Sequence, residues 1–126
     1  MSELTSLEKA RIAVEAALDK GGQEVVVLDV REVVSFADLL MIVTGRSDRQ
    51  VKAIADGVAQ ALSARGERRL GMEGYDEGRW VLIDLADLVV HVFQSEVREH
   101  YDLERLWSDA KRIELGPEDE SARSVV

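Results

Sequence analysis

Two carboxylates, Asp84 and Asp87, lie three residues apart where two apolar runs meet. Paired carboxylates can hold Mg²⁺ or act together as acid and base, so chemistry is sought here first. The neighbouring sequence offers no third carboxylate at a spacing that would complete a metal-binding or catalytic set. We therefore favour a structural interpretation, in which Asp87 forms a turn and Asp84 hydrogen bonds to backbone or to a partner.

Neither the histidines nor the glycine-containing turn strengthens the case for catalysis. His91 lies within an apolar run, where a hydrogen-bonded core or interface residue is more common than a catalyst, and His100 lies among charges. Two histidines without any cysteine are not an adequate ligand set for zinc. Gly45 and Ser47 lie between a strand and a helix, where backbone amides can hold a phosphate. A capping box of Ser47 with Gln50 already explains that serine, so a phosphate site is the weaker interpretation.

Aromatic residues concentrate between Gly74 and Trp107, which hold both tryptophans, both tyrosines and both histidines. Trp80, Tyr101 and Trp107 are the strongest indication of a protein partner, because such side chains bury a large area with little loss of entropy. The alternative is equally well supported. In it, the same side chains pack the core and fold the C-terminal segment onto the sheet.

The spacing of apolar residues predicts the elements that must position these side chains. Helices are expected over residues 3–20, 48–64 and 95–101, and strands over 24–30, 38–44, 67–72, 80–85 and 88–94. The residues that share the apolar face of the first helix are Leu7, Ala10, Val14, Ala17 and Leu18. A tight turn at Ala86 and Asp87 makes the last two strands an antiparallel hairpin.

The order of these elements predicts an α/β (α+β) fold, a mixed five-stranded sheet with helices packed on it. A crossover helix between the second and third strands allows a parallel pair. Both faces of the last two strands are apolar, whereas a sheet covered on one side alternates apolar and polar residues. Either helices cover both faces, or one face is an interaction surface.

Composition narrows the class of protein. The chain has 126 residues, 46% of them hydrophobic and 33% charged, and a formal net charge of −9. We expect one domain over residues 1–115 and a disordered tail over 116–126. The absence of cysteine, of a signal pattern and of a membrane-spanning apolar run favours a cytoplasmic protein. So acidic a surface repels phosphate backbones, which argues against direct nucleic-acid binding and favours a basic protein partner.

A longer pattern runs through GRWVLIDLADLVVHVFQSEVREHYDLERLW. Its positions are Trp80, Asp84, Asp87, His91, Arg98, Tyr101, Leu103, Glu104, Leu106 and Trp107. The pattern resembles the signature of the ribosomal silencing factor family, also called the Iojap family. An upstream segment is similar to the family's strand–Thr-Gly–Ser–Arg–helix segment, through Asp38, Thr44, Gly45, Ser47, Arg49 and Ile54. The resemblance covers roughly residues 5–108.

The resemblance implies a fold like that of nucleotidyltransferases without their catalytic carboxylates, and hence neither an enzyme nor a bound cofactor. It also implies a translational repressor that binds the large ribosomal subunit through its ribosomal protein number fourteen, where the two subunits meet. A factor bound there sterically blocks joining of the small subunit and lowers translation when nutrients are scarce. Members of the family are similar in forming homodimers when free.

We expect the partner to be bound by Glu73, Trp80, Asp84, Asp87, His91, Arg98, Tyr101 and Trp107. Which of these contact the partner and which pack the core is left open. The alternative function is a nucleotidyltransferase-like, nucleotide-binding enzyme that uses Gly45, Ser47, Asp84 and Asp87. A third possibility is a scaffold dimer without ribosome contact.

Overall fold

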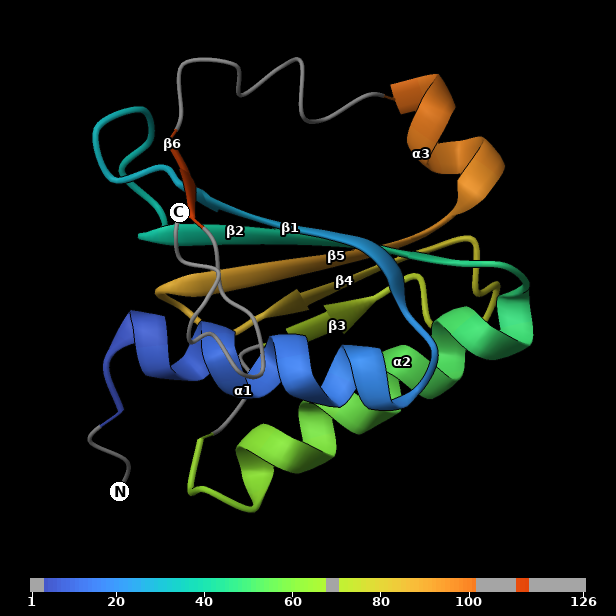
Figure 1. Ribbon diagram of the computed structural model, residues 1–126, viewed down its shortest axis with the longest axis horizontal. Helices are drawn as coiled ribbons and strands as arrows, with labels where there is room; N and C mark the ends of the chain where they lie inside the picture. Colours follow the sequence, from blue (N-terminus) through green and yellow to red (C-terminus); the bar gives the residue numbers. More distant parts are fainter. Residues whose placement is uncertain (1–3, 68–70, 102–110, 114–126) are drawn as a thin grey trace.

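The computed structural model describes residues 4–67, 71–101 and 111–113, and of His100 and Tyr101 it describes the backbone. The predicted tail at 116–126 lies outside these residues, so its disorder and the single domain over 1–115 stay predictions. The described elements are α1 Ser6–Asp19, β1 Gln23–Asp29, β2 Leu39–Gly45, α2 Asp48–Ser63, β3 Gly71–Glu73, β4 Trp80–Asp84, β5 Leu88–Gln94, α3 Ser95–Tyr101 and β6 Lys111–Ile113 (Figure 1).

The strands form one mixed sheet in the order β3-β4-β5-β2-β1-β6. β2 and β5 pair in parallel, and the other neighbours pair antiparallel. The predicted mixed sheet and the predicted hairpin of β4 and β5 are therefore confirmed. The crossover helix α2 does not produce a parallel pair of the second and third strands, because it leads the chain to β3 at the edge of the sheet. The parallel partner of β2 is β5.

The predicted count of five strands is wrong, because β6 adds a sixth to the edge of β1. Ile113 lies opposite Val27, and Lys111 lies opposite Asp29. β6 is three residues long and has one apolar side chain, so it has no strand periodicity of its own. Its hydrogen-bonding partner comes from the other end of the chain, which no local pattern shows.

α1 and α2 cover one face of the sheet, and α3 lies on the opposite side (Figure 1). A capping box begins α1: Glu8 N donates to Thr5 Oγ1 (3.1 Å) and Thr5 N donates to Glu8 Oε1 (2.9 Å). Ser47 caps α2, accepting from Gln50 N at 3.1 Å. Among the described residues, no helix combines the length and the apolar character that crossing a membrane would need.

The core on the helix-covered face is built from alanine, valine, leucine and isoleucine side chains, with one methionine. It joins Ala10, Ala13, Val14 and Ala17 of α1 to Val51, Ile54, Val58 and Leu62 of α2, and to Leu39, Met41, Val43, Val81, Ile83, Val90 and Val92 of the strands. Small side chains on α1 allow the helix to approach the sheet closely. The predicted apolar face of α1 is wrong at both ends, because Leu7 is 47% exposed and Leu18 is 40% exposed.

Lys9 of α1 is buried instead, with 8% of its surface exposed. Its Nζ lies 2.7 Å from Asp87 Oδ1 and 2.8 Å from Glu67 Oε1. Burial alone would lower the pKa of Lys9, but the hydrogen bonds with the two carboxylates outweigh burial and raise it. The ammonium therefore ties α1 to the β4–β5 turn and to the segment after α2.

Replacing Lys9 by alanine is expected to lower the free energy of unfolding by about 2 kcal/mol, because two carboxylates lose their cation and one of them, Glu67, has only 10% of its side chain exposed. The loss stays below that of a fully buried pair, since Asp87 is still partly exposed to water. Urea denaturation measures it. Glu15→Ala, on the same helix at an exposed position, is the control and is expected to change stability by less than about 0.5 kcal/mol. Equal effects of the two substitutions on the free energy of unfolding would show that the ion pairs of Lys9 do not stabilise the fold.

Candidate protein-binding face

The turn between β4 and β5 is held by the side chain of Asp84. Its Oδ1 accepts a hydrogen bond from Ala86 N at 2.9 Å. Ala86 has a φ of 74°, a conformation that non-glycine residues adopt rarely, so this bond helps to maintain the turn. The predicted hydrogen bond from Asp84 to backbone is confirmed. Asp87 completes the turn and pairs with Lys9.

The register of the hairpin brings the chemically distinctive side chains to one face of the sheet. Trp80 lies opposite Phe93, Leu82 opposite His91, and Asp84 opposite Val89. Glu73 of β3 lies opposite Leu82. Because directly opposed residues project to the same side, all of these occupy the face away from α1 and α2. We call Glu73, Trp80, Leu82, Asp84 and His91 the open face.

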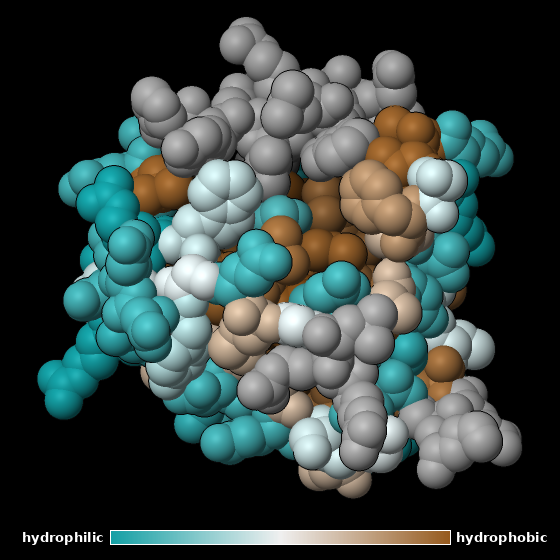
Figure 2. Space-filling view, turned by 180° about the vertical axis from the view of Figure 1, so that it is seen from behind, coloured by the Kyte–Doolittle hydropathy of each residue, from teal (hydrophilic) through white to brown (hydrophobic). Residues whose placement is uncertain are grey.

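The open face is covered unevenly. A second apolar cluster, which includes Val26, Leu28, Leu40, Ile42 and Val97, lies on this side of β1, β2 and β5. Val34 and Ala37, from the connection between β1 and β2, pack against it. Towards the β3 edge, Trp80, Leu82 and Asp84 are half-buried and Glu73 is exposed. Figure 2, seen from behind the view of Figure 1, shows hydrophobic atoms near the middle of the surface with hydrophilic groups around them.

Three aromatic rings pack together on this face. The Trp80 and Phe93 rings are 4.8 Å apart, and His91 stacks on Phe93 at 5.9 Å with an interplanar angle of 8°. The Trp80 indole Nε1–H donates to His91 Nδ1 at 2.9 Å. Phe93 is fully buried, whereas Trp80 keeps part of its surface in solvent. The cluster therefore has a buried base and a partly exposed tryptophan.

His91 is electrically neutral in this environment. It is 8% exposed, and burial lowers its pKa to about 4. Because Nδ1 accepts the hydrogen bond from Trp80, the proton of the neutral imidazole resides on Nε2. A neutral histidine that accepts a structural hydrogen bond is poorly suited to act as a general acid or base at neutral pH.

Arg98, one of the residues predicted to bind a partner, hydrogen bonds to other elements of the fold. It is 8% exposed. Its Nη1 donates to Glu24 O at 2.6 Å and to Thr44 Oγ1 at 2.7 Å. These bonds attach α3 to the ends of β1 and β2. Asp87 is similarly paired with Lys9, so both charged side chains make contacts within the protein.

The eight predicted binding residues therefore separate into groups. Glu73, Trp80 and Asp84 lie on the partly exposed area of the open face, and His91 lies beneath Trp80. Asp87 and Arg98 make internal contacts. The side chain of Tyr101 and the whole of Trp107 lie outside the described residues. Leu82, which the prediction left out, belongs to the open face, and its alternation with Trp80 and Asp84 along β4 was the available signal.

The four residues of the alternative nucleotide site do not come together. The parallel register places Gly45 beside Gln94, at the end of β5, and places Leu39 beside Leu88, at its start. Ser47 follows Gly45, whereas Asp84 and Asp87 flank the start of β5. The two pairs are therefore separated by more than about 15 Å along the strands. In the described part of the chain, no three His, Asp or Glu side chains are grouped so that they could hold a metal ion.

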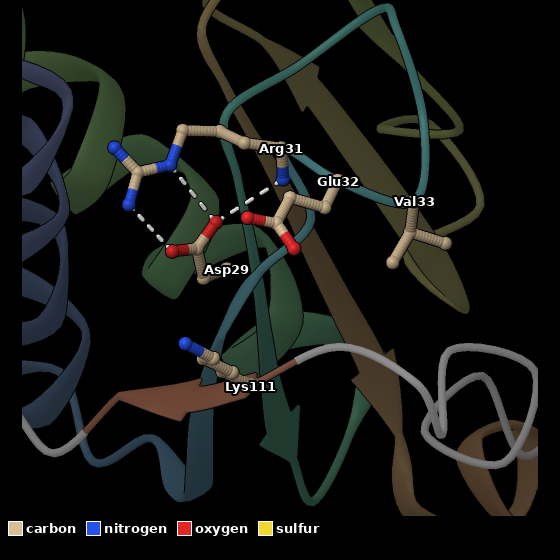
Figure 3. Close-up of a pocket in the computed structure, with 5 residues that line it drawn as sticks. All are labelled: Asp29, Arg31, Glu32, Val33 and Lys111. Carbon is tan, nitrogen blue, oxygen red and sulfur yellow. Dashed lines mark hydrogen bonds and ion pairs between the residues drawn. The ribbon is translucent and has the colours of Figure 1, made fainter.

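A cavity of about 300 Å³, which the sequence did not indicate, lies at the other edge of the sheet. Its lining residues are Asp29, Arg31, Glu32, Val33 and Lys111 (Figure 3). Arg31 donates to the Asp29 carboxylate through Nε at 3.0 Å and through its backbone N at 3.1 Å. These hydrogen bonds lower the pKa of Asp29 to about 2. Because the central carboxylate is already paired, we assign this cavity no ligand.

Comparison with known proteins gives consistent matches. A sequence model of the family described as "Ribosomal silencing factor during starvation" matches residues 3–125. The ribosomal silencing factor of Halalkalibacterium halodurans is 41% identical over 112 residues, which cover 89% of this chain and 96% of that protein. The ribosomal silencing factor of Bacillus subtilis is 43% identical over 105 residues, covering 83% and 89%.

A more distant relative and a solved structure extend these matches. A mouse protein named "Mitochondrial assembly of ribosomal large subunit protein 1" is 27% identical over 92 residues, covering 71% of this chain and 40% of that protein. A crystal structure of a Chromobacterium violaceum protein superposes with a TM-score of 0.82 at 35% identity, covering 94% of this chain and all of that one. The α/β fold with its mixed sheet is thus shared with a solved protein of similar sequence.

Burial of His91 predicts a specific dependence of stability on pH. Its pKa falls from 6.5 in the unfolded chain to about 4 in the folded protein, so the unfolded chain binds more protons between these values. The contribution of His91 is fully present above pH 6.5 and is lost as the pH falls towards 4. The expected decrease in the free energy of unfolding is about 3 kcal/mol.

Urea denaturation at several pH values between 7 and 4.5 measures this dependence. His91→Asn cannot take up the proton and is the control, because the carboxylates titrate alike in both proteins. We expect the stability of the original protein to fall more steeply with decreasing pH than that of the variant. Parallel curves for the two proteins would contradict the assignment of the pH dependence to His91.

Proposed function

Because this chain belongs to the ribosomal silencing factor family, we propose that it is a translational repressor that acts by binding the large ribosomal subunit. The matched residues, 3–125, include every helix and strand of the described part of the chain. The mouse relative, whose name refers to assembly of the ribosomal large subunit, supports the choice of that subunit.

The open face is the surface that we propose for the contact. The observation that supports it is a half-buried tryptophan, Trp80, on the same sheet face as two carboxylates, Glu73 and Asp84. A tryptophan of this kind supplies large burial at an interface, and carboxylates on the same face favour a basic partner. The net charge of −9 favours the same class of partner. We propose that the partner is large-subunit ribosomal protein number fourteen.

We propose that the protein represses translation by occupying its binding site on the large subunit, without any chemical reaction. A protein of 126 residues bound where the subunits meet would block the small subunit sterically. This proposal includes action in the cytoplasm under nutrient limitation. In support, the carboxylates considered for catalysis are committed to the turn and to Lys9.

Co-sedimentation with purified large subunits tests the proposal, together with the yield of joined ribosomes after small subunits are added. We expect the protein to sediment with large subunits and to raise the fraction that stays unjoined. Trp80→Ala is expected to weaken binding about thirtyfold, since it removes the central apolar anchor. Glu73→Lys is expected to weaken it about fivefold, with a smaller effect at high salt.

Glu15→Lys is the matched control, because it makes the same charge change on the helix-covered side of the molecule. It is expected to leave binding within about twofold of the original. Asp87 is a poor choice for this test, since its replacement breaks the pair with Lys9. Equal binding by folded Trp80→Ala, Glu73→Lys and Glu15→Lys proteins would rule out the open face as the contact.

We also propose that the free protein is a homodimer. If the dimer uses the open face, dimerisation and ribosome binding compete. Light scattering over a range of concentrations is expected to show a dimer that Trp80→Ala weakens in parallel with subunit binding. A dimer unaffected by Trp80→Ala would place the dimer contact elsewhere.

A further inference from the structure

We propose that His91 is a positioning residue that holds the indole ring of Trp80 in the orientation in which the open face receives its partner. The bond concerned is Trp80 Nε1–H to His91 Nδ1, at 2.9 Å. The expected effect of His91 on partner binding rests on the proposed function. The hydrogen bond that orients Trp80 is a property of the free protein and does not.

The position of His91 in the sheet makes it a firm support. It is in β5, between Leu82 of β4 and Ile42 of β2, and both neighbours are paired to it through the backbone. Its ring stacks on Phe93, which is fully buried. Both the backbone and the ring plane of His91 are therefore restrained, so Nδ1 has a defined place and direction.

Trp80 needs such a support because it is near the edge of the covered area. It is half-buried at the start of β4, and its ring lies 4.8 Å from the ring of Phe93. A contact between apolar ring surfaces restricts sliding and rotation only weakly, whereas a hydrogen bond to the indole N–H selects one direction. A ring held in one orientation before binding loses less entropy on association.

The hydrogen bond matters more once a partner covers the face. In the free protein, water can replace a missing acceptor for a half-exposed indole N–H. After association that water is excluded, and an N–H without an acceptor lowers affinity. The effect of His91 is therefore expected in the affinity for the partner in addition to the stability of the fold.

Two substitutions separate positioning from simple packing. Asparagine places Oδ1 where histidine has Nδ1, so His91→Asn keeps an acceptor for Trp80. Glutamine places its polar atoms one bond further out. His91→Gln therefore carries the same neutral amide group as His91→Asn, but it has no acceptor at the position of Nδ1. We expect His91→Asn to bind purified large subunits within about threefold of the original, and His91→Gln to bind about tenfold more weakly.

Proton–nitrogen NMR of the free protein reads the bond directly. The indole N–H resonance of Trp80, assigned with Trp80→Phe, is expected to stay near its original position in His91→Asn and to move in His91→Gln. At pH 7 the nitrogen shifts of His91 are expected to be those of the neutral tautomer protonated at Nε2. This last measurement uses the unmodified protein and does not depend on whether a variant folds.

The outcomes are distinguishable. An Nδ1-protonated or charged His91 at pH 7 overturns the proposal, and so does an indole resonance that is the same in the original protein and in His91→Gln. Equal weakening of subunit binding by both variants with unchanged indole resonances also overturns it, because loss of general packing would then be the cause. If the original protein does not sediment with large subunits, the proposed function fails, while the NMR data still decide the role of His91.

Discussion

The two central strands are apolar on both faces, and this constraint governs the rest of the structure. All seven residues of β2 and six of the seven in β5 are buried, so the sheet needs cover on both sides. α1 and α2 cover one side along its length. On the other side the described cover is α3 and the connection between β1 and β2, while Trp80 and Leu82 of β4 are partly exposed. The surface that we propose for the partner thus lies where, among the described residues, the cover of the sheet thins towards its edge.

The charged side chains of this protein have two different roles, and the direction in which each side chain points separates these roles. Lys9 and Arg98, both 8% exposed, point into the protein and connect α1 and α3 to segments distant in sequence. Glu73 and Asp84 project from the open face, where carboxylates suit a basic partner. The pattern through which the chain resembles the family contains both kinds of residue, Trp80 and Asp84 as well as Arg98. The resemblance alone therefore could not separate Trp80, which we propose as a contact residue, from Arg98, which hydrogen bonds within the fold.

Apolar periodicity predicted the helices, the strands β1 to β5 and the hairpin, because it reports which side of an element is buried. It misjudged α1, where Leu7 and Leu18 are exposed and Lys9 is buried. Lys9 is tolerated inside because Asp87 and Glu67 meet its ammonium, and their approach depends on how the hairpin and α2 pack. β6 escaped prediction for a similar reason, since its pairing with β1 depends on distant chain and not on its own three residues.

The sequence by itself determined which side chains share a face within each strand, because that alternation is a property of extended backbone. It placed Trp80 with Leu82 and Asp84, and His91 with Phe93. Only the tertiary structure decided that these two sets lie on the same side, since the hairpin register aligns Leu82 with His91 and allows the indole to reach Nδ1. The parallel pairing of β2 with β5 likewise decided that Gly45 lies far from Asp84. The register between β2 and β5 arises from packing and hydrogen bonding across the sheet, and no local pattern in the chain contains it.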